Sequence, residues 1–298
     1  MNFDWQIIGH TQQLGFLRKA IEANFLSHAF IFAGPEGVGK KTVASRFAQI
    51  LLCENRTACG VCSQCHMLAL KSNPDLIELN GQNESIGVPE IRTLREKLSL
   101  KPYAGQYKFA IIDQAENLTQ EASNALLKVF EEPTAYTIII LITTNPQKLL
   151  KTIRSRAQIM NFGLVEELEY QNLIVKDLAE TQKSLIKTIA RGRPGLVKII
   201  ATDADLLVKL EDYKKDWEQM RQSNVLDRLL ATQKIFDLET PEIKSFLTYW
   251  LNDLHASFQI QPSRVSAINL KSIEKAKRLL DQNVNQKLIF FDLCFNLV

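Results

Sequence analysis

Residues 34 to 42 read Gly-Pro-Glu-Gly-Val-Gly-Lys-Lys-Thr, a phosphate-binding loop with one unusual position. Gly34, Gly39 and Lys40 meet the pattern Gly-x4-Gly-Lys, whose backbone amides and lysine cradle phosphates at the start of a helix. The next position normally carries a Ser or Thr hydroxyl that binds Mg²⁺, but here it is Lys41. The sequence therefore predicts a nucleotide-hydrolase frame with a weak or vestigial nucleotide site at Gly34, Gly37, Gly39, Lys40, Lys41 and Thr42.

The composition is that of an ordinary soluble protein, with 46% hydrophobic and 23% charged residues in a chain of 298. This length indicates two or three domains. A net charge of +3 neither demonstrates nucleic-acid binding nor excludes a local basic track. The first ten residues contain Asp4 and no long apolar run, and no apolar stretch is long enough to span a bilayer. We therefore expect a cytoplasmic protein without membrane contact.

The first half of the chain alternates short apolar strands with amphipathic helices. The predicted strands are His28–Ala33, Asp75–Leu79, Lys108–Asp113, Thr137–Thr144 and Ala157–Asn161. The predicted helices among them are Gly39–Leu52, Val88–Leu100 and Thr119–Glu132. Apolar strands alternating with helices indicate an α/β domain with a parallel sheet covered on both faces.

After Phe162 the strand pattern ends and helical periodicity takes over. The predicted helices are Val165–Thr188, Leu206–Met220, Asn224–Phe236, Pro241–Phe258, Lys271–Leu280 and Asn285–Leu297, with a turn at Arg191–Gly195. We predict three domains: an α/β domain at 1–163, a small helical lid at 164–205 and an all-α domain at 206–298.

Two polar positions follow buried strands, as nucleotide-site residues do. Asp113 is the last residue of the strand Lys108–Asp113 and could serve as a Mg²⁺ ligand. Alternatively, it has no role beyond ending the strand. The next residue is Gln114, an amide that cannot accept a proton as a catalytic base, and Glu116 lies further along. Asn145 could sense a γ-phosphate, but Asn145-Pro146 is equally ordinary turn chemistry.

Four cysteines lie close together directly after the helix that follows the loop. Cys53, Cys59, Cys62 and Cys65 can supply four thiolates to a tetrahedral zinc ion, leaving no coordination position for water. Thiols stay reduced in the cytosol, so metal ligation is favoured over disulfides. His66 could replace one ligand, but Cys53 completes the sulfur set more simply. The sequence predicts a structural zinc module at residues 53–66.

Basic residues at two places could be ordinary surface residues or could bind phosphate groups. Arg156, after Ile153-Arg-Ser, could be a surface arginine or could reach a neighbouring subunit's phosphate. A second group could track a phosphate backbone, but interleaved glutamates favour a solvated face. This group is Arg92, Arg95, Lys97 and Lys101.

Together these segments resemble the clamp-loader branch of the AAA+ proteins. The resemblance rests on the loop Gly34–Thr42, the cysteine cluster, Asn73-Pro-Asp75, the segment 113–116, the run Asn124-Ala-Leu-Leu-Lys-Val-Phe-Glu-Glu-Pro133 and Ser155-Arg156. It extends from His10 to about Gly195. Within that branch, Lys41, Gln114 and Gly195 stand where hydrolysing subunits keep a hydroxyl, an acid and a sensor arginine. The chain is therefore most similar to the delta-prime subunits of the bacterial DNA polymerase III clamp loader.

The resemblance implies a stator subunit without ATPase activity of its own, part of a DNA-directed DNA polymerase (nucleotidyltransferase) holoenzyme. It implies structural zinc, an arginine finger at Arg156 and an oligomerising collar formed by the helical C-terminus. The implied partners are the tau/gamma ATPase subunits, the delta subunit, the sliding clamp and primed DNA. Two alternatives remain: an ATPase in its own right, using Thr42 and Glu116, and a zinc-module DNA-binding protein.

Overall fold

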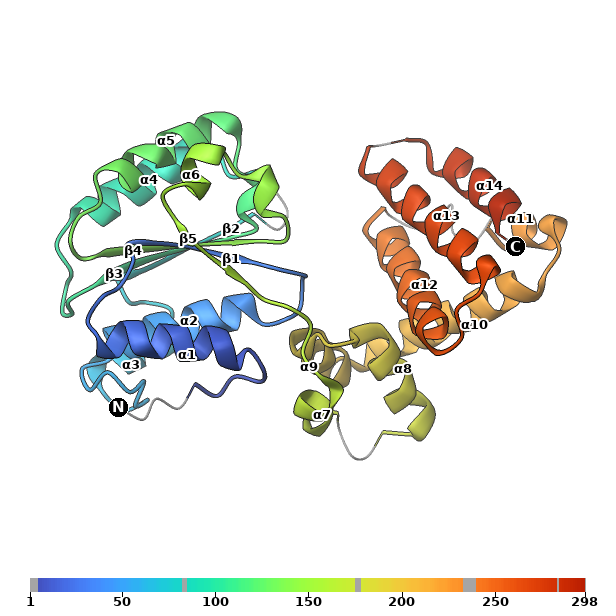
Figure 1. Cartoon of the computed structure of the whole chain (residues 1–298), viewed down its shortest axis with the longest axis horizontal. Coiled ribbons are helices and arrows are strands. Elements are labelled where there is room, and N and C mark those ends of the chain that lie inside the picture. Colours follow the sequence, from blue (N-terminus) through green and yellow to red (C-terminus); the bar gives the residue numbers. More distant parts are fainter. Residues whose placement is uncertain (1–4, 82–84, 175–177, 233–239, 283, 298) are drawn as a thin grey trace. The chain divides into compact units, whose positions relative to one another are not determined.

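A computed structural model describes residues 5–81, 85–174, 178–232, 240–282 and 284–297 (Figure 1). The chain forms two compact units. The first comprises Met1–Tyr170 with Gly192–Gly195, and the second comprises Gln171–Arg191 with Leu196–Val298. The division into three domains stays a prediction. Across the described residues, no helix is both long and apolar enough to cross a membrane.

The first unit is built on a five-stranded sheet in which every strand pair is parallel. The strands are β1 (Ala29–Ala33), β2 (Leu76–Asn80), β3 (Lys108–Asp113), β4 (Thr137–Thr143) and β5 (Gln158–Asn161). Their order across the sheet is β2-β3-β4-β1-β5. Each predicted strand is present to within one residue at either end, so the predicted α/β fold class is confirmed.

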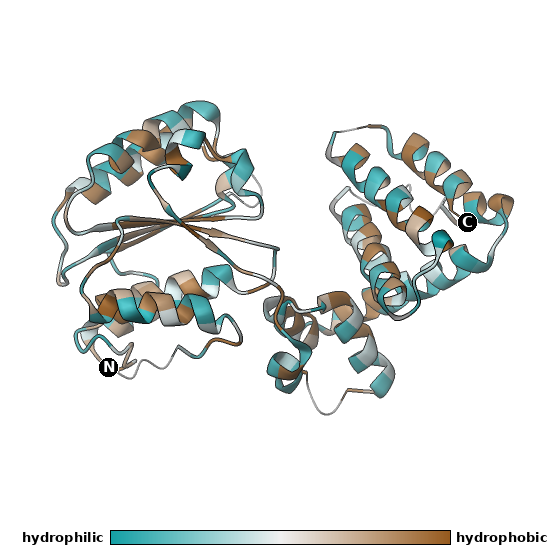
Figure 2. Ribbon diagram, viewed as in Figure 1, coloured by the Kyte–Doolittle hydropathy of each residue, from teal (hydrophilic) through white to brown (hydrophobic). Residues whose placement is uncertain are grey.

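Helices cover both faces of the sheet (Figure 1). One face is covered by α1 (Thr11–Glu22), α2 (Lys40–Leu52) and α3 (Ser63–Ala69), and the other by α4 (Val88–Ser99), α5 (Gln120–Glu131) and α6 (Lys151–Arg154). Alternate strand residues enter the two cores: Phe30 and Phe32 pack toward α2, whereas Ile31 packs toward α4 and α5. The three central strands, β1, β3 and β4, are accordingly mostly apolar and almost entirely buried (Figure 2), as expected for strands covered on both faces. The edge strands β2 and β5 also carry exposed polar residues.

Short helical segments complete the first unit. They are η1 (Ala115–Asn117), η2 (Pro146–Lys148) and α7 (Glu167–Tyr170). The first two follow β3 and β4 directly, so they begin at the carboxyl edge of the sheet.

The second unit is entirely helical over its described residues. Its elements are η3 (Gln171–Leu173), α8 (Glu180–Ala190), α9 (Pro194–Thr202), α10 (Ala204–Gln222), α11 (Val225–Thr232), α12 (Thr240–Ile260), α13 (Arg264–Asp281) and α14 (Gln286–Asn296), with the first two residues of α9 assigned to the first unit. Trp217 and Trp250 stack in its core with ring centroids 4.6 Å apart, and the Trp217 indole N–H donates to Asp253. The predicted all-α C-terminal part is confirmed.

Several helical predictions need correction. The predicted single helix Val165–Thr188 is wrong, because α7, η3 and α8 divide that stretch. The predicted turn at Arg191–Gly195 is correct only for its first part, since α9 already begins at Pro194, a favourable first helical residue. The end of the predicted helix Asn224–Phe236 lies outside the described residues. Helices α1 and α3 were not predicted.

Candidate functional site

The parallel sheet brings the predicted nucleotide-site residues to a common edge. The phosphate loop follows β1, Asp113 ends β3, and Thr144 and Asn145 follow β4. Because all the strands run in one direction, these carboxyl-terminal loops lie at the same side of the sheet. The predicted grouping of the loop with Asp113 is therefore present in the structure.

Glycines allow the phosphate loop its tight path. Gly37 and Gly39 have φ angles of 79° and 103°, in the left-handed region that disfavours other residues. A Cβ atom on Gly34 would lie 2.0 Å from the carbonyl oxygen of Phe162, so only glycine fits there. The loop thus retains the backbone of a phosphate-binding loop, although its side chains depart from the pattern.

Lys41 forms an ion pair with Asp113, the residue that the sequence suggests as a Mg²⁺ ligand. Its ammonium nitrogen lies 3.3 Å from Asp113 Oδ2, and the two side chains are 45% and 20% exposed. The backbone N–H of Gln114 donates to Oδ1 of the same carboxylate at 3.0 Å. Both oxygens of Asp113 are therefore engaged within the protein, and one of them faces a cation.

Lys40, the phosphate-loop lysine, contacts the loop itself. Its ammonium group donates to the carbonyl oxygens of Gly34 and Pro35 at 2.5 and 2.7 Å, and the residue is only 6% exposed. Burial lowers the pKa of Lys40, while Glu116, Asp113 and Glu36 act in the opposite direction. The side chain therefore stabilises the loop from within.

Glu116, the alternative catalytic base, is held by the segment after β4. Its Oε1 accepts hydrogen bonds from the backbone N–H and the hydroxyl of Thr144, at 3.0 and 2.5 Å. Burial raises the pKa of Glu116, but these hydrogen bonds outweigh it and the pKa is lowered overall. A carboxylate stabilised in this way is a weaker proton acceptor.

The side chain of Asn145 caps a turn. Its carboxamide oxygen accepts from the backbone N–H of Gln147 at 2.9 Å, which makes Asn145 the N-cap of η2. This arrangement agrees with the turn interpretation. The neighbouring Thr144 is the residue that connects the end of β4 to Glu116.

Gly195 packs directly against the phosphate loop. Its N–H donates to the carbonyl oxygen of Gly37 at 2.9 Å, and a Cβ atom at this position would lie 2.9 Å from the same oxygen. A larger residue here would have to displace the loop.

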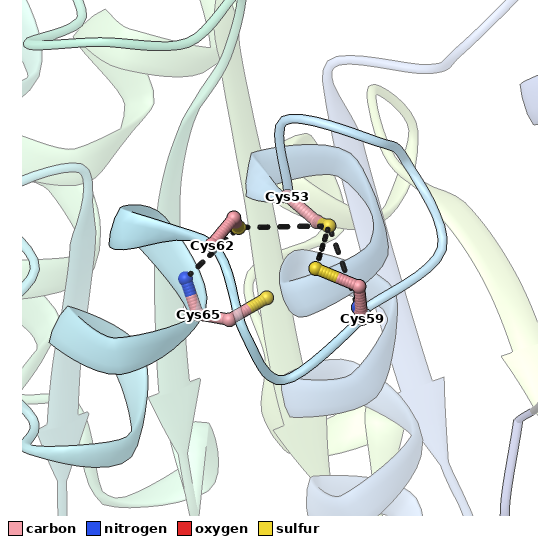
Figure 3. Close-up of side chains that lie close together, drawn as sticks. All are labelled: Cys53, Cys59, Cys62 and Cys65. Atoms are coloured by element: carbon pink, nitrogen blue, oxygen red, sulfur yellow. Dashed lines mark hydrogen bonds between the residues drawn. The ribbon is translucent and has the colours of Figure 1, made fainter.

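The four cysteines converge on one point between α2 and α3 (Figure 3). Their sulfur atoms all lie within 4.8 Å of one another, and Cys53 Sγ lies 3.6 Å from Cys59 Sγ and 3.9 Å from Cys62 Sγ. A tetrahedral zinc ion with Zn–S bonds of about 2.3 Å needs sulfurs about 3.8 Å apart. The cluster therefore fits a tetrahedral metal ion, and the four sulfurs suffice without His66.

The thiols of this cluster differ in acidity because their surroundings differ. Burial opposes ionisation of Cys53, but backbone N–H groups of Cys59, Thr57 and Asn55 lower its pKa to about 6. Burial raises the pKa of Cys65 to about 12. Since a metal binds thiolates, it must displace protons from the less acidic members of the set.

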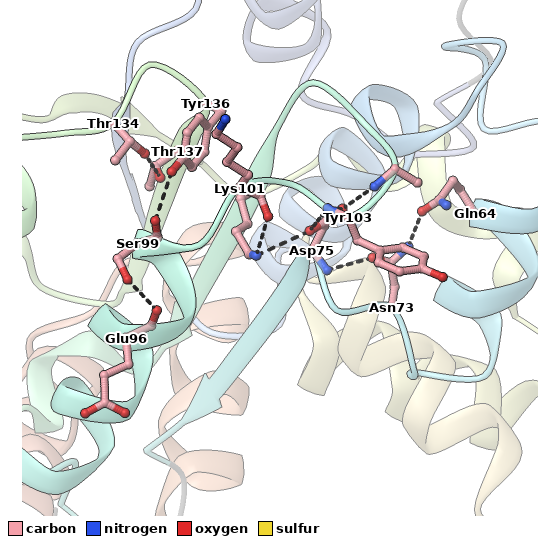
Figure 4. A network of polar contacts seen from close by, with 12 residues as sticks. Gln64, Asn73, Asp75, Glu96, Ser99, Lys101, Tyr103, Thr134, Tyr136 and Thr137 are labelled. Atoms are coloured by element: carbon pink, nitrogen blue, oxygen red, sulfur yellow. Dashed lines mark hydrogen bonds and ion pairs between the residues drawn. The ribbon is translucent and has the colours of Figure 1, made fainter.

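A buried polar network connects the cysteine module to the sheet (Figure 4). Gln64 of α3 accepts a hydrogen bond from Asn73, and Asn73 accepts one from the backbone N–H of Asp75. Asp75 is fully buried; it accepts two N–H groups of the segment before β3 and lies 3.5 Å from the Lys108 ammonium. The run Asn73-Pro-Asp75 is thus a structural junction.

Arg156 lies between α6 and β5, where it is held by two contacts. Its Nη2 lies 3.2 Å from Glu131 Oε1, and its Nη1 donates to the Thr152 carbonyl at 3.2 Å. The side chain of Arg156 is 39% exposed. Nothing in the sequence pattern indicated Glu131 as its partner.

The basic residues of α4 line a groove of mixed charge. Arg92 and Arg95 share this groove, between α4 and α5, with Lys128 and with the glutamates Glu96, Glu131 and Glu132.

Comparison with known proteins identifies the family of this chain. The profile of the family described as "DNA polymerase III, delta subunit" matches residues 9–166, more than half of the chain. DNA polymerase III subunit tau of Bacillus subtilis is 38% identical over 159 residues, 52% of this chain and 28% of the relative. DNA polymerase III subunit delta' of the same organism is 32% identical over 180 residues, 59% of this chain and 55% of the relative.

The chain thus spans under two thirds of the length of these relatives. A solved gamma subunit-related protein of DNA polymerase III from Thermotoga maritima is 18% identical, with a TM-score of 0.49 over 94% of this chain and 97% of that one. The predicted clamp-loader resemblance is confirmed by the family profile, and the chain belongs to the DNA polymerase III delta-subunit family.

Proposed function

We propose that this chain is a non-hydrolysing subunit of the bacterial clamp loader of DNA polymerase III. In this role it assembles with the tau/gamma ATPase subunits and the delta subunit, and it helps place the sliding clamp on primed DNA in the cytoplasm. The observation that carries the proposal is the ion pair between Lys41 and Asp113. Family membership supports the assembly, and this ion pair supports the absence of hydrolysis.

The pair conflicts with magnesium binding in two ways. Mg²⁺ at a phosphate loop takes the hydroxyl after the loop lysine and the aspartate of the neighbouring strand as its links to the protein. Here the hydroxyl is absent, and the aspartate is neutralised by a side chain that occupies one of its oxygens. A metal ion would have to displace the ammonium group and would meet its repulsion.

The isolated chain should not hydrolyse ATP above background, because Lys41 and Gln114 remove a metal ligand and a base that normally act as a unit. Phosphate release by the purified chain, measured with the Lys40→Ala variant in parallel, tests this. Turnover that disappears in Lys40→Ala would instead show that the chain is itself an ATPase.

The geometry gives less support to the alternative of an ATPase in its own right. That alternative requires Thr42 to supply the hydroxyl and Glu116 to supply the base. Thr42 lies one residue beyond the usual position, and Glu116 is hydrogen-bonded to Thr144 with a lowered pKa. The position of Thr42 and the hydrogen bond of Glu116 therefore do not favour these catalytic roles.

In the proposed assembly, Arg156 serves as an arginine finger for a neighbouring ATPase subunit. Arg156→Ala should leave the chain folded and able to assemble, but it should lower the clamp- and DNA-stimulated ATPase rate of the reconstituted complex by at least about fivefold. A single finger contributes roughly 10³–10⁵ in rate at its own site. A loss of about fivefold in total turnover is expected where the sites hydrolyse ATP in one coupled cycle, because the slowed site then limits the others. Steady-state phosphate release and clamp loading would measure the loss.

Arg154, two residues earlier, is the matched control for this experiment. Its guanidinium donates to the side chain of Gln147 within the same segment, so Arg154→Ala should have the smaller effect. Arg156→Lys should rescue poorly because an ammonium cannot make bidentate contacts with a phosphoryl group. If assembled Arg156→Ala complexes load clamps at the full rate, Arg156 is a surface residue without a catalytic role.

The helical unit offers a surface suited to the collar of such a complex. Helices α11 and α14 pack together, and each leaves large apolar side chains exposed at helical spacing. These side chains are Leu226, Leu230, Leu288, Phe291 and Phe295. Exposed apolar groups on adjacent helices favour a protein partner, and we assign this face to the helical domain of a neighbouring clamp-loader subunit.

A further inference from the structure

We propose that Glu131 is the positioning residue for Arg156, holding its guanidinium group ready for the phosphate of a neighbouring subunit. This inference rests on the proposed arginine finger. It adds a second residue, 25 positions earlier in the chain, whose role is to orient the first. The contact that carries it is the Arg156 Nη2 to Glu131 Oε1 distance of 3.2 Å.

Buried neighbours fix the backbone on both sides of this pair. Glu131 is the last residue of α5, directly after Phe130, which is 2% exposed. Arg156 follows Ile153 of α6, which is fully buried in the same core. Helices α5 and α6 pack against each other on one face of the sheet (Figure 1). The charged groups are therefore the exposed ends of two rigidly anchored segments.

The two contacts of Arg156 leave part of its guanidinium group free. One terminal nitrogen donates to the Thr152 carbonyl and the other faces Glu131, while an arginine has five N–H donors in one plane. Two contacts on a planar group fix its orientation, so the remaining donors point in a defined direction. An orientation set in advance lowers the side-chain entropy lost when a phosphate is bound.

Exposure of the pair argues against a purely stabilising role. The side chains of Arg156 and Glu131 are 39% and 49% exposed, and ion pairs at such positions contribute little to folding. Arg154 and Glu132, which lie near the pair in sequence, can be compared with Arg156 and Glu131. Arg154 hydrogen-bonds to the neutral Gln147 side chain, and Glu132 is exposed at the same helix end, one position beyond Glu131.

The experiment uses a clamp loader reconstituted from full-length subunits, with ATP turnover measured in the presence of clamp and primed DNA. Glu131→Gln keeps the size of the side chain and removes its charge, and Glu132→Gln is the matched control. We expect Glu131→Gln to lower kcat by about two- to fivefold with little change in KM, and Glu132→Gln to behave as the parent. In an Arg156→Ala background, Glu131→Gln should cause no further loss, since there is then no guanidinium to orient.

A charge exchange tests whether Arg156 is needed for more than its ion pair with Glu131. The double variant Glu131→Arg/Arg156→Glu restores an ion pair but places the arginine on α5. If the pair only stabilised the fold, this variant would recover activity; we expect it to stay at the level of Arg156→Ala.

The inference would be overturned by recovery of activity in the charge exchange, by an additive loss in the Arg156→Ala background, by an equal loss in Glu132→Gln, or by a rise in turnover in Glu131→Gln. The last would show that Glu131 restrains the finger. If Arg156→Ala itself has no effect on turnover, then the proposed function fails at the finger. If Arg156→Ala lowers turnover and Glu131→Gln does not, only the positioning role fails.

Discussion

One zinc ion per chain should accompany the purified protein, and losing it should lower the melting temperature by about 6–12 °C. This shift corresponds to roughly 3 kcal/mol for a unit of this size. The expected ligands are Cys53, Cys59, Cys62 and Cys65, whose sulfurs already have the spacing of a tetrahedral site. Metal analysis, then thermal unfolding with and without a strong chelator, would measure both quantities.

The expected loss of stability is large because the module has little else to hold it together. The loop between α2 and α3 contributes few buried apolar side chains of its own, so metal ligation must supply much of its folding free energy. Gln64 of α3 is hydrogen-bonded to Asn73, which in turn fixes Asp75 before β2. Disorder in the module should therefore reach the edge of the sheet.

Single substitutions can identify the ligands. Cys53→Ser should lose the metal, since Cys53 lies near the sulfurs of both Cys59 and Cys62. His66→Ala should keep one zinc ion and an unchanged melting temperature, because the side chain of His66 is exposed and the four sulfurs already complete the site. The opposite pattern would assign the fourth ligand to His66.

The strands and the cysteine site were predictable because their determinants are local. The central strands β1, β3 and β4 are short, mostly apolar runs bounded by polar or turn residues, as strands buried on both faces require. The four cysteines lie within 13 consecutive residues, from Cys53 to Cys65, so few backbone paths could separate them. The position of Asp113 beside the phosphate loop followed from the common direction of the parallel strands.

Some helices could not be bounded from sequence, and two, α1 and α3, were not predicted. Helix α1 does carry a pattern, since Leu14, Leu17 and Ile21 form its buried face, although Gly15 weakens its helix propensity. Conversely, the periodicity of Val165–Thr188 is real, but tertiary packing divides the segment. Tyr170 is buried in the first unit and hydrogen-bonds to Gly192, a contact that no local pattern could reveal.

The pairing of charged and polar side chains was the least predictable feature. Lys41 and Asp113, Glu116 and Thr144, and Glu131 and Arg156 are each at least 25 residues apart in sequence. The topology brings their backbones together, but the rotamers and the competing partners decide which groups meet. The sequence therefore predicted the lost hydroxyl at position 41 but not the ion pair that Lys41 forms.

Replacing Lys41 should convert the phosphate loop into a magnesium-dependent nucleotide site. Lys41→Thr removes the cation from Asp113 and adds the hydroxyl that the loop lacks, so both protein links to Mg²⁺ become available. We expect its affinity for Mg-ATP to exceed that of the parent by at least about tenfold, equivalent to about 1.4 kcal/mol. Fluorescent-nucleotide titration with Mg²⁺ and with excess EDTA would measure the change.

Two controls separate the hydroxyl from the loss of the cation. Lys41→Ala frees Asp113 without supplying a ligand, and Lys41→Thr/Asp113→Asn supplies the hydroxyl but neutralises the aspartate. Both should bind more weakly than Lys41→Thr. The single variant should still hydrolyse ATP no faster than background, because Gln114 remains in place of the base and Glu116 remains hydrogen-bonded to Thr144. Equal Mg-ATP affinity in the parent and in Lys41→Thr would mean that breaking the Lys41–Asp113 ion pair requires little free energy. The proposed absence of hydrolysis would then depend on Gln114 and Gly195.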